Sequence, residues 1–202
     1  RFSGATAVPI PLLESKGFSF DAEQVLSLIT PRTRLLIVNT PANPTGGIVR
    51  REELAKLVAG LEKHPQVAVL SDEIYARLIY DGERHASLLE FESIRDRLIV
   101  LDGWSKTFSM TGWRLGWGLW PKQWAAAAER LQINSTSCPS APVQVAAIEA
   151  LRGPQDSVER MCRAFDERRK LIVRELNSIP GFSCVMPKGA FYAFPNISAT
   201  GM

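Results

Sequence analysis

Lys106 is the residue in this chain best placed for covalent chemistry. It follows the short run Arg97-Leu-Ile-Val-Leu101, whose branched apolar residues predict a buried β-strand. Open α/β sheets bind ligands at the carboxyl ends of their strands, so we expect Lys106 in a loop at a binding edge. The aromatic and apolar residues around it in the sequence are Trp104, Phe108, Met110 and Trp113. Partial desolvation among them would favour the neutral amine, which can attack a carbonyl carbon.

Two more predicted strands end in polar motifs. Asn39-Thr-Pro-Ala-Asn-Pro-Thr-Gly46 follows the apolar run 34–38, and Ser71-Asp-Glu-Ile-Tyr75 follows the run 67–70. The carboxyl ends of parallel strands meet at one edge, so these motifs should lie near Lys106. Arg114, eight residues after Lys106, carries a planar charged fork that suits a phosphate group.

Each of these residues also has an ordinary interpretation when taken singly. A lysine after a strand is usually a solvated loop residue, and Asp72 alone would be a turn or helix cap. Tyr75 alone would be a half-buried core residue, and Asn43-Pro44 a turn. The ordered combination is what indicates a site.

The elements that must position these residues follow from hydrophobic spacing. Predicted strands are 7–13, 34–38, 67–70, 97–101, 115–120, 182–185 and 190–194, and predicted helices are 21–29, 52–62, 121–133, 142–151 and 156–179. The strand 115–120 follows its predecessor closely enough to run antiparallel, whereas helical crossovers imply parallel pairing for the earlier strands.

Helix ends and the long final helix carry their own signals. Asp21 with Gln24, and Asp156 with Glu159, predict capped helix starts. The final helix has one apolar face, formed by Val158, Met161, Phe165, Ile172, Leu176 and Ile179. We interpret its charged residues as a solvated face: Arg163, Glu167, Arg168, Arg169, Lys170 and Arg174.

The fold class expected is α/β: a mostly parallel sheet sandwiched by helices, followed by the start of a smaller α+β domain. A change of pattern at Pro154 divides the chain into residues 1–153 and residues 154–202. The chain starts without methionine and stops after a predicted strand, so we interpret it as a fragment of a longer protein.

Composition narrows the classes of function. The net charge of +3 is small and its basic residues are scattered, which argues against nucleic acid or an anionic membrane as a partner. Cys138, Cys162 and Cys184 are widely spaced, and the two histidines are isolated, so we expect neither a disulfide framework nor a metal site. No apolar run reaches the length of a membrane span, and a reducing cytoplasm fits best.

The three motifs, in this order, resemble those of the class I and II aminotransferases, which are pyridoxal-phosphate enzymes of the aspartate aminotransferase fold. The third motif is Ser105-Lys106 followed by Gly112-Trp-Arg-Leu-Gly116, and the resemblance covers essentially the whole chain. It implies ping-pong transfer of an amino group from an amino acid to a 2-oxo acid, with pyridoxal 5'-phosphate as cofactor and a homodimer as the assembly.

The resemblance also implies a role for each motif residue. Lys106 would form the Schiff base and shuttle the substrate proton. Asp72 would protonate the ring nitrogen, so that the ring acts as an electron sink. Tyr75 and Asn43 would donate hydrogen bonds to the phenolic oxygen. The phosphate would be bound by Arg114, with a hydroxyl from Ser105 or Ser109.

Some of the resemblance remains open. Gly103 replaces a phosphate-binding serine found in many relatives, which would remove one hydroxyl from the phosphate site. Residues 134–137 resemble a segment near the subunit interface but could equally be a polar loop. Residues 187–192 resemble a turn that approaches the substrate, although their aromatic residues could equally be core. We also predict a cis peptide at Asn43-Pro44.

Other functions share parts of this pattern. A lyase or synthase of the same fold would retain all these coenzyme residues. A transcription regulator that senses the coenzyme would carry a helix-turn-helix domain upstream. The substrate-carboxylate arginine, the aromatic residue that stacks on the ring and the upstream phosphate turn fall outside this chain in the resembled family, so the sequence does not identify the substrate.

Overall fold

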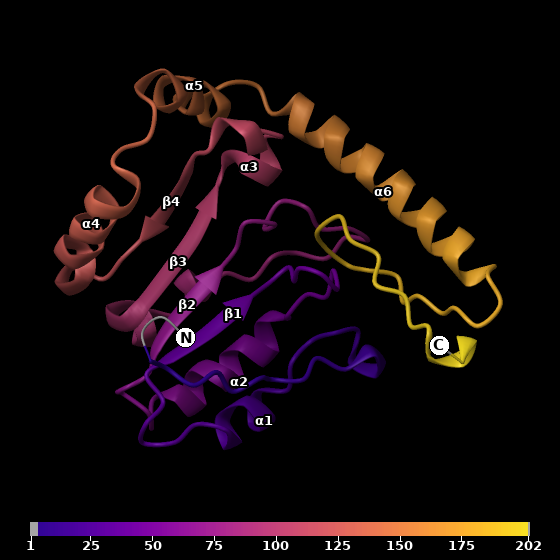
Figure 1. Ribbon diagram of the computed structural model, residues 1–202, viewed down its shortest axis with the longest axis horizontal. Coiled ribbons are helices and arrows are strands. Elements are labelled where there is room, and N and C mark those ends of the chain that lie inside the picture. The colour runs from indigo at the N-terminus through magenta and orange to yellow at the C-terminus, as the bar shows by residue number, and fades with distance from the viewer. Residues whose placement is uncertain (1–3, 202) are drawn as a thin grey trace.

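A four-stranded sheet lies at the centre of the computed structural model, which describes residues 4–201 (Figure 1). Its strands, β1 (Leu35–Asn39), β2 (Ala68–Asp72), β3 (Leu98–Gly103) and β4 (Gly116–Leu119), lie side by side in that order. The first three strands are parallel and β4 is antiparallel to β3, which confirms both pairing predictions. The parallel arrangement brings the ends of β1, β2 and β3 to one edge.

Helices α1 (Ala22–Ser27) and α2 (Arg51–Leu61) pack against each other on one side of the sheet (Figure 1). Asp21 caps α1 as predicted, because its carboxylate accepts hydrogen bonds from the backbone amides of Glu23 and Gln24. The apolar face of α2 is buried through Leu54, Leu57, Val58 and Leu61, at the spacing expected of an amphipathic helix. A Cβ atom at Gly60 would lie 2.1 Å from Leu26 Cδ1, so a larger residue there would have to displace the Leu26 side chain.

The strand β1 is buried on one face only. Leu36 and Val38 belong to the main hydrophobic cluster, whereas Leu35 and Ile37 are 46% and 60% exposed. The apolar run of β1 therefore contacts helices on one side and leaves the other side open. By contrast, Leu98, Ile99 and Val100 of β3 are all buried.

After β3 the chain turns sharply and returns. The short helices α3 (Trp104–Thr107) and η4 (Thr111–Trp113) lead into β4, and α4 (Lys122–Thr136), α5 (Ala141–Arg152) and α6 (Asp156–Asn177) follow (Figure 1). Short 3₁₀ helices occupy Glu14–Lys16, Leu88–Glu90, Glu92–Arg97 and Ser198–Thr200. The indole of Trp104 donates a hydrogen bond to the carbonyl of Ala147, which ties α3 to α5.

Three predicted strands are absent from the described structure. Residues 7–13 form no strand, since this exposed run pairs with no other segment there. Residues 182–185 and 190–194 form loops: Ser183 makes an isolated bridge with Asn196, and Gly189, just before the second run, makes one with Ile79. Ala190 has a φ of 57°, a conformation that is incompatible with a regular strand ladder.

The helix α6 differs from its prediction in three ways. Asp156 is its first residue, while Gln155 occupies the cap position without a side-chain cap, so the predicted capping pair does not form. Ile172 and Ile179 are exposed, and Val173 is buried instead. Arg169, predicted on a solvated face, is only 6% exposed. Tertiary contacts with loops outside the helix decide which side is covered.

The structure also shows the state of the cysteines and the character of the helices. Cys138, Cys162 and Cys184 are all free thiols. Among residues 4–201, no helix combines the length and the apolarity needed to cross a membrane.

Candidate active site

Lys106 lies at the carboxyl edge of the sheet, but it is part of the short helix α3 and not of a loop as predicted. Its partly buried amine lies 5.9 Å from the centre of the Tyr75 ring and 5.6 Å from that of Phe191. Trp113 is 52% exposed, so the prediction that neighbouring aromatic residues enclose the lysine is wrong for this residue. The rings nearest the amine come from segments distant in sequence.

At the end of β2, the carboxylates of Asp72 and Glu73 point to opposite faces of the sheet. Side chains alternate along a strand, so Asp72 faces one side of the sheet while Ser71 and Glu73 face the other. A hydrogen bond of 2.8 Å from the Ser71 hydroxyl to Glu73 agrees with this alternation, and Asp72 Oδ1 accepts one of 3.2 Å from the amide of Ile74. Asp72 alone is therefore available on the face of the sheet opposite to α2.

Glu73 belongs to a buried polar network and not to the site. It lies 2.8 Å from His85 Nε2 and also accepts hydrogen bonds from the Ser87 hydroxyl and the Leu88 amide. Burial pushes the pKa of Glu73 upward, but the hydrogen bond and charge of His85 and the two serine hydroxyls outweigh it, and the net shift is downward. The network anchors the segment after β2 to the core.

The loop after β1 brings Asn43 to the same edge. Asn39 holds this loop, because its side chain donates to the carbonyl of Asp72 and accepts from the amide of Asn43 at 2.8 Å. The Asn43-Pro44 peptide is cis, which confirms the prediction, and Thr40-Pro41 is cis as well. The side chain of Asn43 is exposed at the edge and forms a hydrogen bond with Tyr75.

Tyr75 forms a hydroxyl pair with Tyr192. The two oxygen atoms are 2.6 Å apart, and the rings meet edge to face at a centroid distance of 5.7 Å. Burial raises the pKa of the Tyr75 hydroxyl above its usual range, and the hydrogen bond to Tyr192 and the charge of Asp72 act in the same direction. Tyr75 is thus a protonated hydrogen-bond donor at neutral pH.

Ser105 and Arg114 both lie in the segment between β3 and β4. Arg114 adopts a left-handed conformation with a φ of 54°, and its guanidinium donates to the carbonyl of Thr111 while staying exposed. The hydroxyl of Thr111 reaches the carbonyl of Ser105 at 3.4 Å. Ser109 points elsewhere, with its hydroxyl 2.8 Å from the sulfur of Met161. Thr111 therefore links the exposed guanidinium of Arg114 to the backbone of Ser105.

Gly103 has a packing reason for its lack of a side chain. It pairs with Gly116 across β3 and β4, and a Cβ atom at Gly103 would lie 2.8 Å from Gly116 Cα and 3.0 Å from the carbonyl oxygen of Leu115. The backbone of Gly103 is extended, so space and not conformation excludes a larger residue. The strands approach too closely here for an unshifted serine.

The segment 187–192, which the sequence left open between a substrate-facing turn and core, lies at the site. Its Phe191 contacts Lys106 and meets the Tyr75 ring edge to face at 5.4 Å. Apart from two adjacent aromatic residues shortly after a glycine, no local pattern indicated the Tyr75–Tyr192 pair. Residues 134–136, by contrast, form the exposed last turn of α4, with Ser137 at its end.

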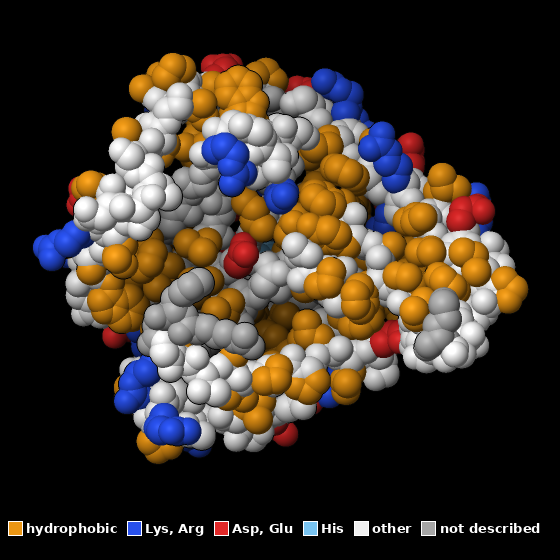
Figure 2. All heavy atoms as spheres, viewed as in Figure 1, with side chains coloured by type: hydrophobic (Ala, Val, Ile, Leu, Met, Phe, Trp, Pro, Cys, Tyr) orange, Lys and Arg blue, Asp and Glu red, His pale blue; other side chains and the backbone are white. Residues whose placement is uncertain are grey.

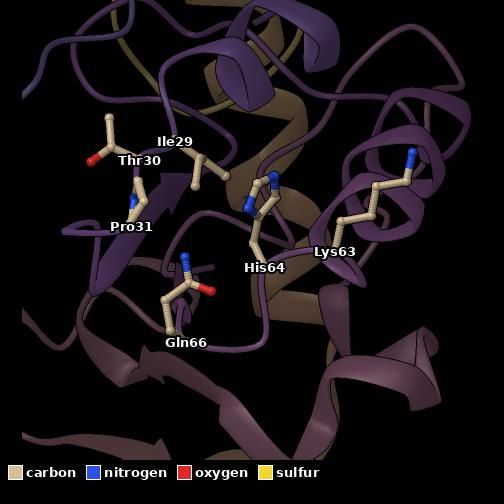
Figure 3. A pocket seen from close by; sticks show the side chains of 6 residues that line it. All are labelled: Ile29, Thr30, Pro31, Lys63, His64 and Gln66. Atoms are coloured by element: carbon tan, nitrogen blue, oxygen red, sulfur yellow. The ribbon is translucent and has the colours of Figure 1, made fainter.

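Two cavities found among the described residues do not define the site. One of about 320 Å³ lies at the amino ends of β1 and β2, opposite Lys106, and its lining is mostly exposed (Figure 3): Ile29, Thr30, Pro31, Lys63, His64 and Gln66. Another, of about 100 Å³, lies beside Gly103 and Asp102. Figure 2 shows acidic, basic and hydrophobic side chains around a hollow near the centre of the viewed face.

Comparison with known proteins identifies the family of this chain. The family model for aminotransferase class I and II matches residues 1–202. An aspartate aminotransferase of Geobacillus stearothermophilus is 43% identical over 197 residues, which are 97% of this chain and 50% of that protein. An aromatic-amino-acid aminotransferase of Thermococcus litoralis is 38% identical over 99% of this chain and 51% of its own length.

Solved structures agree with the sequence comparison. The aromatic aminotransferase of Pyrococcus horikoshii superposes with a TM-score of 0.91 at 38% identity, covering 96% of this chain and 52% of that one. Aspartate aminotransferase of Thermus thermophilus with maleate gives a TM-score of 0.89 at 35% identity, covering 98% and 51%. The chain spans about half the length of the curated relatives it matches. It belongs to the class I and II aminotransferases, a family of pyridoxal-phosphate-dependent enzymes.

Proposed function

We propose that this chain forms the coenzyme-binding part of an aminotransferase that moves an amino group from an amino acid to a 2-oxo acid by a ping-pong mechanism. One observation carries the proposal: an amine, a carboxylate, a phenol with an amide, and a guanidinium all lie at the ends of adjacent parallel strands or in the turn that follows them. Relatives named as aminotransferases support it, and none of those named here is a lyase or a regulator.

The donor set fits pyridoxal phosphate group by group. Lys106 would bond to the aldehyde carbon, and Asp72 would hold a proton on the ring nitrogen. Tyr75 and Asn43, which already share a hydrogen bond, would both donate to the phenolic oxygen. The exposed guanidinium of Arg114 would bind the phosphate, with Ser105 beside it.

When bound, pyridoxal phosphate supplies an electron-accepting ring that stabilises the charge left by a departing α-proton. The chain's own residues supply the rest. The amine of Lys106 would accept the substrate's α-proton and return it during the transfer. Phe191, which lies against the amine, limits the access of water to it. The fixed carboxylate of Asp72 and hydroxyl of Tyr75 require little rearrangement as charge develops.

Domain division, assembly and location complete the proposal. Residues 1–153 would belong to the large coenzyme domain, and residues 154–202 would lead through α6 into a smaller one. A homodimer is supported by exposed apolar residues on α4 and α5: Leu131, Ile133, Val145, Ile148 and Leu151. Three free thiols are consistent with a reducing cytoplasm. The modest net charge does not favour nucleic acid or an anionic membrane as a partner.

The test uses the complete protein with bound coenzyme. Aspartate, phenylalanine and alanine are supplied in turn with 2-oxoglutarate, and formation of glutamate is measured. Borohydride reduction followed by peptide mapping should place the coenzyme on Lys106. Recovery of the label on Lys122 or Lys188, or elimination products in place of glutamate, would contradict the proposal.

A further inference from the structure

The segment 187–192 determines what covers the reactive lysine. Phe191 lies 5.6 Å from the amine of Lys106, and the hydroxyl of Tyr192 lies 2.6 Å from that of Tyr75. Neither residue is part of the sheet or of the turn that carries Lys106. Their positions therefore depend on whatever holds this segment in place.

Backbone contacts fix one side of the segment. The amides of Lys188 and Gly189 both donate to the carbonyl of Gly46, at 3.0 and 2.9 Å, and the amide of Ala190 donates to Leu78 at 2.8 Å. These contacts join the segment to the loops that follow β1 and β2, and Figure 1 shows it lying between those loops and α6. The contact is close, because a Cβ atom at Gly46 would lie 2.4 Å from the side chain of Pro187.

Arg169 fixes the other side from α6. Its side chain is 4% exposed, and its guanidinium donates to the carbonyl of Pro187 at 2.7 Å. The same guanidinium forms a two-pronged pair with Asp81, at 2.7 and 3.0 Å, and its Nε donates to Asp166 at 2.9 Å. It also lies 4.5 Å from the centre of the Tyr80 ring. Every side of the buried cation thus has a partner.

Tyr80 and Phe165 extend this anchor toward the site. The hydroxyl of Tyr80 donates to the carbonyl of Ala190 at 2.6 Å, directly before Phe191. Phe165, one turn before Arg169 on α6, stacks on the Phe191 ring at 5.4 Å. A buried guanidinium held by a fork of acceptors has one geometry, so α6 and the segment must move together or not at all.

We propose that Arg169 is a positioning residue: from α6 it fixes the segment 187–192 so that Phe191 and Tyr192 lie against Lys106 and Tyr75. This inference rests on the proposed function, since it assigns Arg169 to the same site. Without the hydrogen bonds of the Arg169 guanidinium, the segment 187–192 would move away from Lys106. Small displacements near reacting groups can cost on the order of a hundredfold in rate.

Hydrogen exchange in the complete protein without coenzyme tests the anchoring directly. Arg169→Met should accelerate exchange of the amides of residues 188–190 by on the order of a hundredfold, because it removes the hydrogen bonds from the buried guanidinium to Pro187 and Asp81 and leaves Asp81 only its exposed pair with Lys188. Arg169→Lys keeps the positive charge but loses the planar guanidinium with its several donors. It should accelerate hydrogen exchange less than Arg169→Met does, in a protein that still folds. Arg174→Met is the matched control, since this exposed arginine of α6 pairs only with Glu175 in the described structure, and it should change nothing there.

A second measurement asks whether Arg169 acts through Tyr192. The pH midpoint of the visible band of the bound coenzyme is measured for Arg169→Lys, Tyr192→Phe and the double variant. The effect of Arg169→Lys should largely disappear in the Tyr192→Phe background, because the hydroxyl pair is then already absent.

Unchanged exchange at residues 188–190 in both Arg169 variants, or additive shifts in the double variant, would overturn the inference. A protein that binds no coenzyme in any form would contradict the proposed function instead. In that case hydrogen exchange at residues 188–190 alone tests whether Arg169 anchors the segment.

Discussion

Asn43 and Tyr75 are the residues through which the chain would tune the coenzyme's phenolic oxygen. Their side chains share a hydrogen bond at the sheet edge, and the Tyr75 hydroxyl stays protonated because burial raises its pKa. Two donors directed at one oxygen atom favour its ionised form. The strength of this effect can be measured one donor at a time.

We predict that Asn43→Ala raises the pH midpoint of the visible coenzyme band by about one unit. A hydrogen bond to a charged oxygen contributes about 1.5–3 kcal/mol, and one pH unit corresponds to about 1.4 kcal/mol. A spectroscopic pH titration of the complete protein measures it. Gln66→Ala, which truncates an exposed amide at the opposite end of the sheet, should leave the midpoint unchanged. An equal midpoint in Asn43→Ala and the parent would remove Asn43 from the site.

Glu73 should contribute to stability in a pH-dependent way. Burial opposes its charge, but hydrogen bonds from His85, Ser71 and Ser87 lower its folded-state pKa below the ordinary value of 4.5. The stabilisation is therefore complete above about pH 4.5 and is lost as the pH falls through the lower folded-state pKa.

Glu73→Gln should lower the free energy of unfolding at pH 7 by about 1–3 kcal/mol, since buried hydroxyl and amide donors lose a charged acceptor. The variant should also lose less stability than the parent on acidification. Urea unfolding at neutral pH and below pH 4.5 measures both effects. Glu92→Gln is the control, because the Glu92 side chain is 85% exposed in its pair with Arg95. Equal acid sensitivity of Glu73→Gln and the parent would show that the carboxylate has no such role.

At the scale of elements, the pairing of β3 with β4 sets the position of the turn that carries Lys106. Gly103 and Gly116 face each other at the end of this pair, and the chain then enters α3. Two glycines allow a strand separation that side chains would prevent. The missing serine hydroxyl is therefore coupled to the sheet geometry.

We predict that Gly103→Ser destabilises the protein by about 1–3 kcal/mol, the usual cost of overpacking, and weakens coenzyme binding in spite of the added hydroxyl. Its Cβ atom would lie 2.8 Å from Gly116 Cα, so β4 or the turn must shift. Thermal unfolding and coenzyme titration measure the two effects. Gly112→Ser is the matched control in the same turn, because a Cβ atom there meets nothing within 4 Å. Tighter coenzyme binding by Gly103→Ser would refute the packing argument.

At the scale of the whole molecule, much apolar surface stays uncovered. Ile37 on the sheet is 60% exposed, and Leu131 and Val145 on α4 and α5 are 69% and 68% exposed. Where exposed apolar side chains gather into a patch, that patch usually contacts another chain or segment. The curated relatives are about twice as long as this chain.

We therefore predict that residues 1–202, expressed alone, self-associate and transaminate at least about a hundredfold more slowly than the complete protein. Productive chemistry requires the substrate to be held in line with Lys106, and modest misplacement costs on the order of a hundredfold. Light scattering and turnover of alanine, aspartate and phenylalanine with 2-oxoglutarate measure the two expectations. Comparable turnover by the two proteins would mean that residues 1–202 already contain the complete substrate site.

The sequence by itself determined the parallel order of the first three strands, the antiparallel return of β4, the cap at Asp21 and the placement of Asp72 at a strand end. These features depend on local periodicity and on residues close in sequence. Such patterns can be recognised without knowing the tertiary structure. The motif order also predicted the family, which the comparisons confirm.

Only the tertiary structure decided which residues surround Lys106 and which side of α6 is covered. Tyr75 and Tyr192 are 117 residues apart, and Arg169 and Asp81 are 88 residues apart, so no local pattern predicts either contact. Arg169 has the same sequence signature as its exposed neighbours Arg168 and Lys170. It is buried because Asp81, 88 residues earlier in the chain, supplies a carboxylate to it. Burial of a charge depends on such a partner and not on the helix that carries the charge.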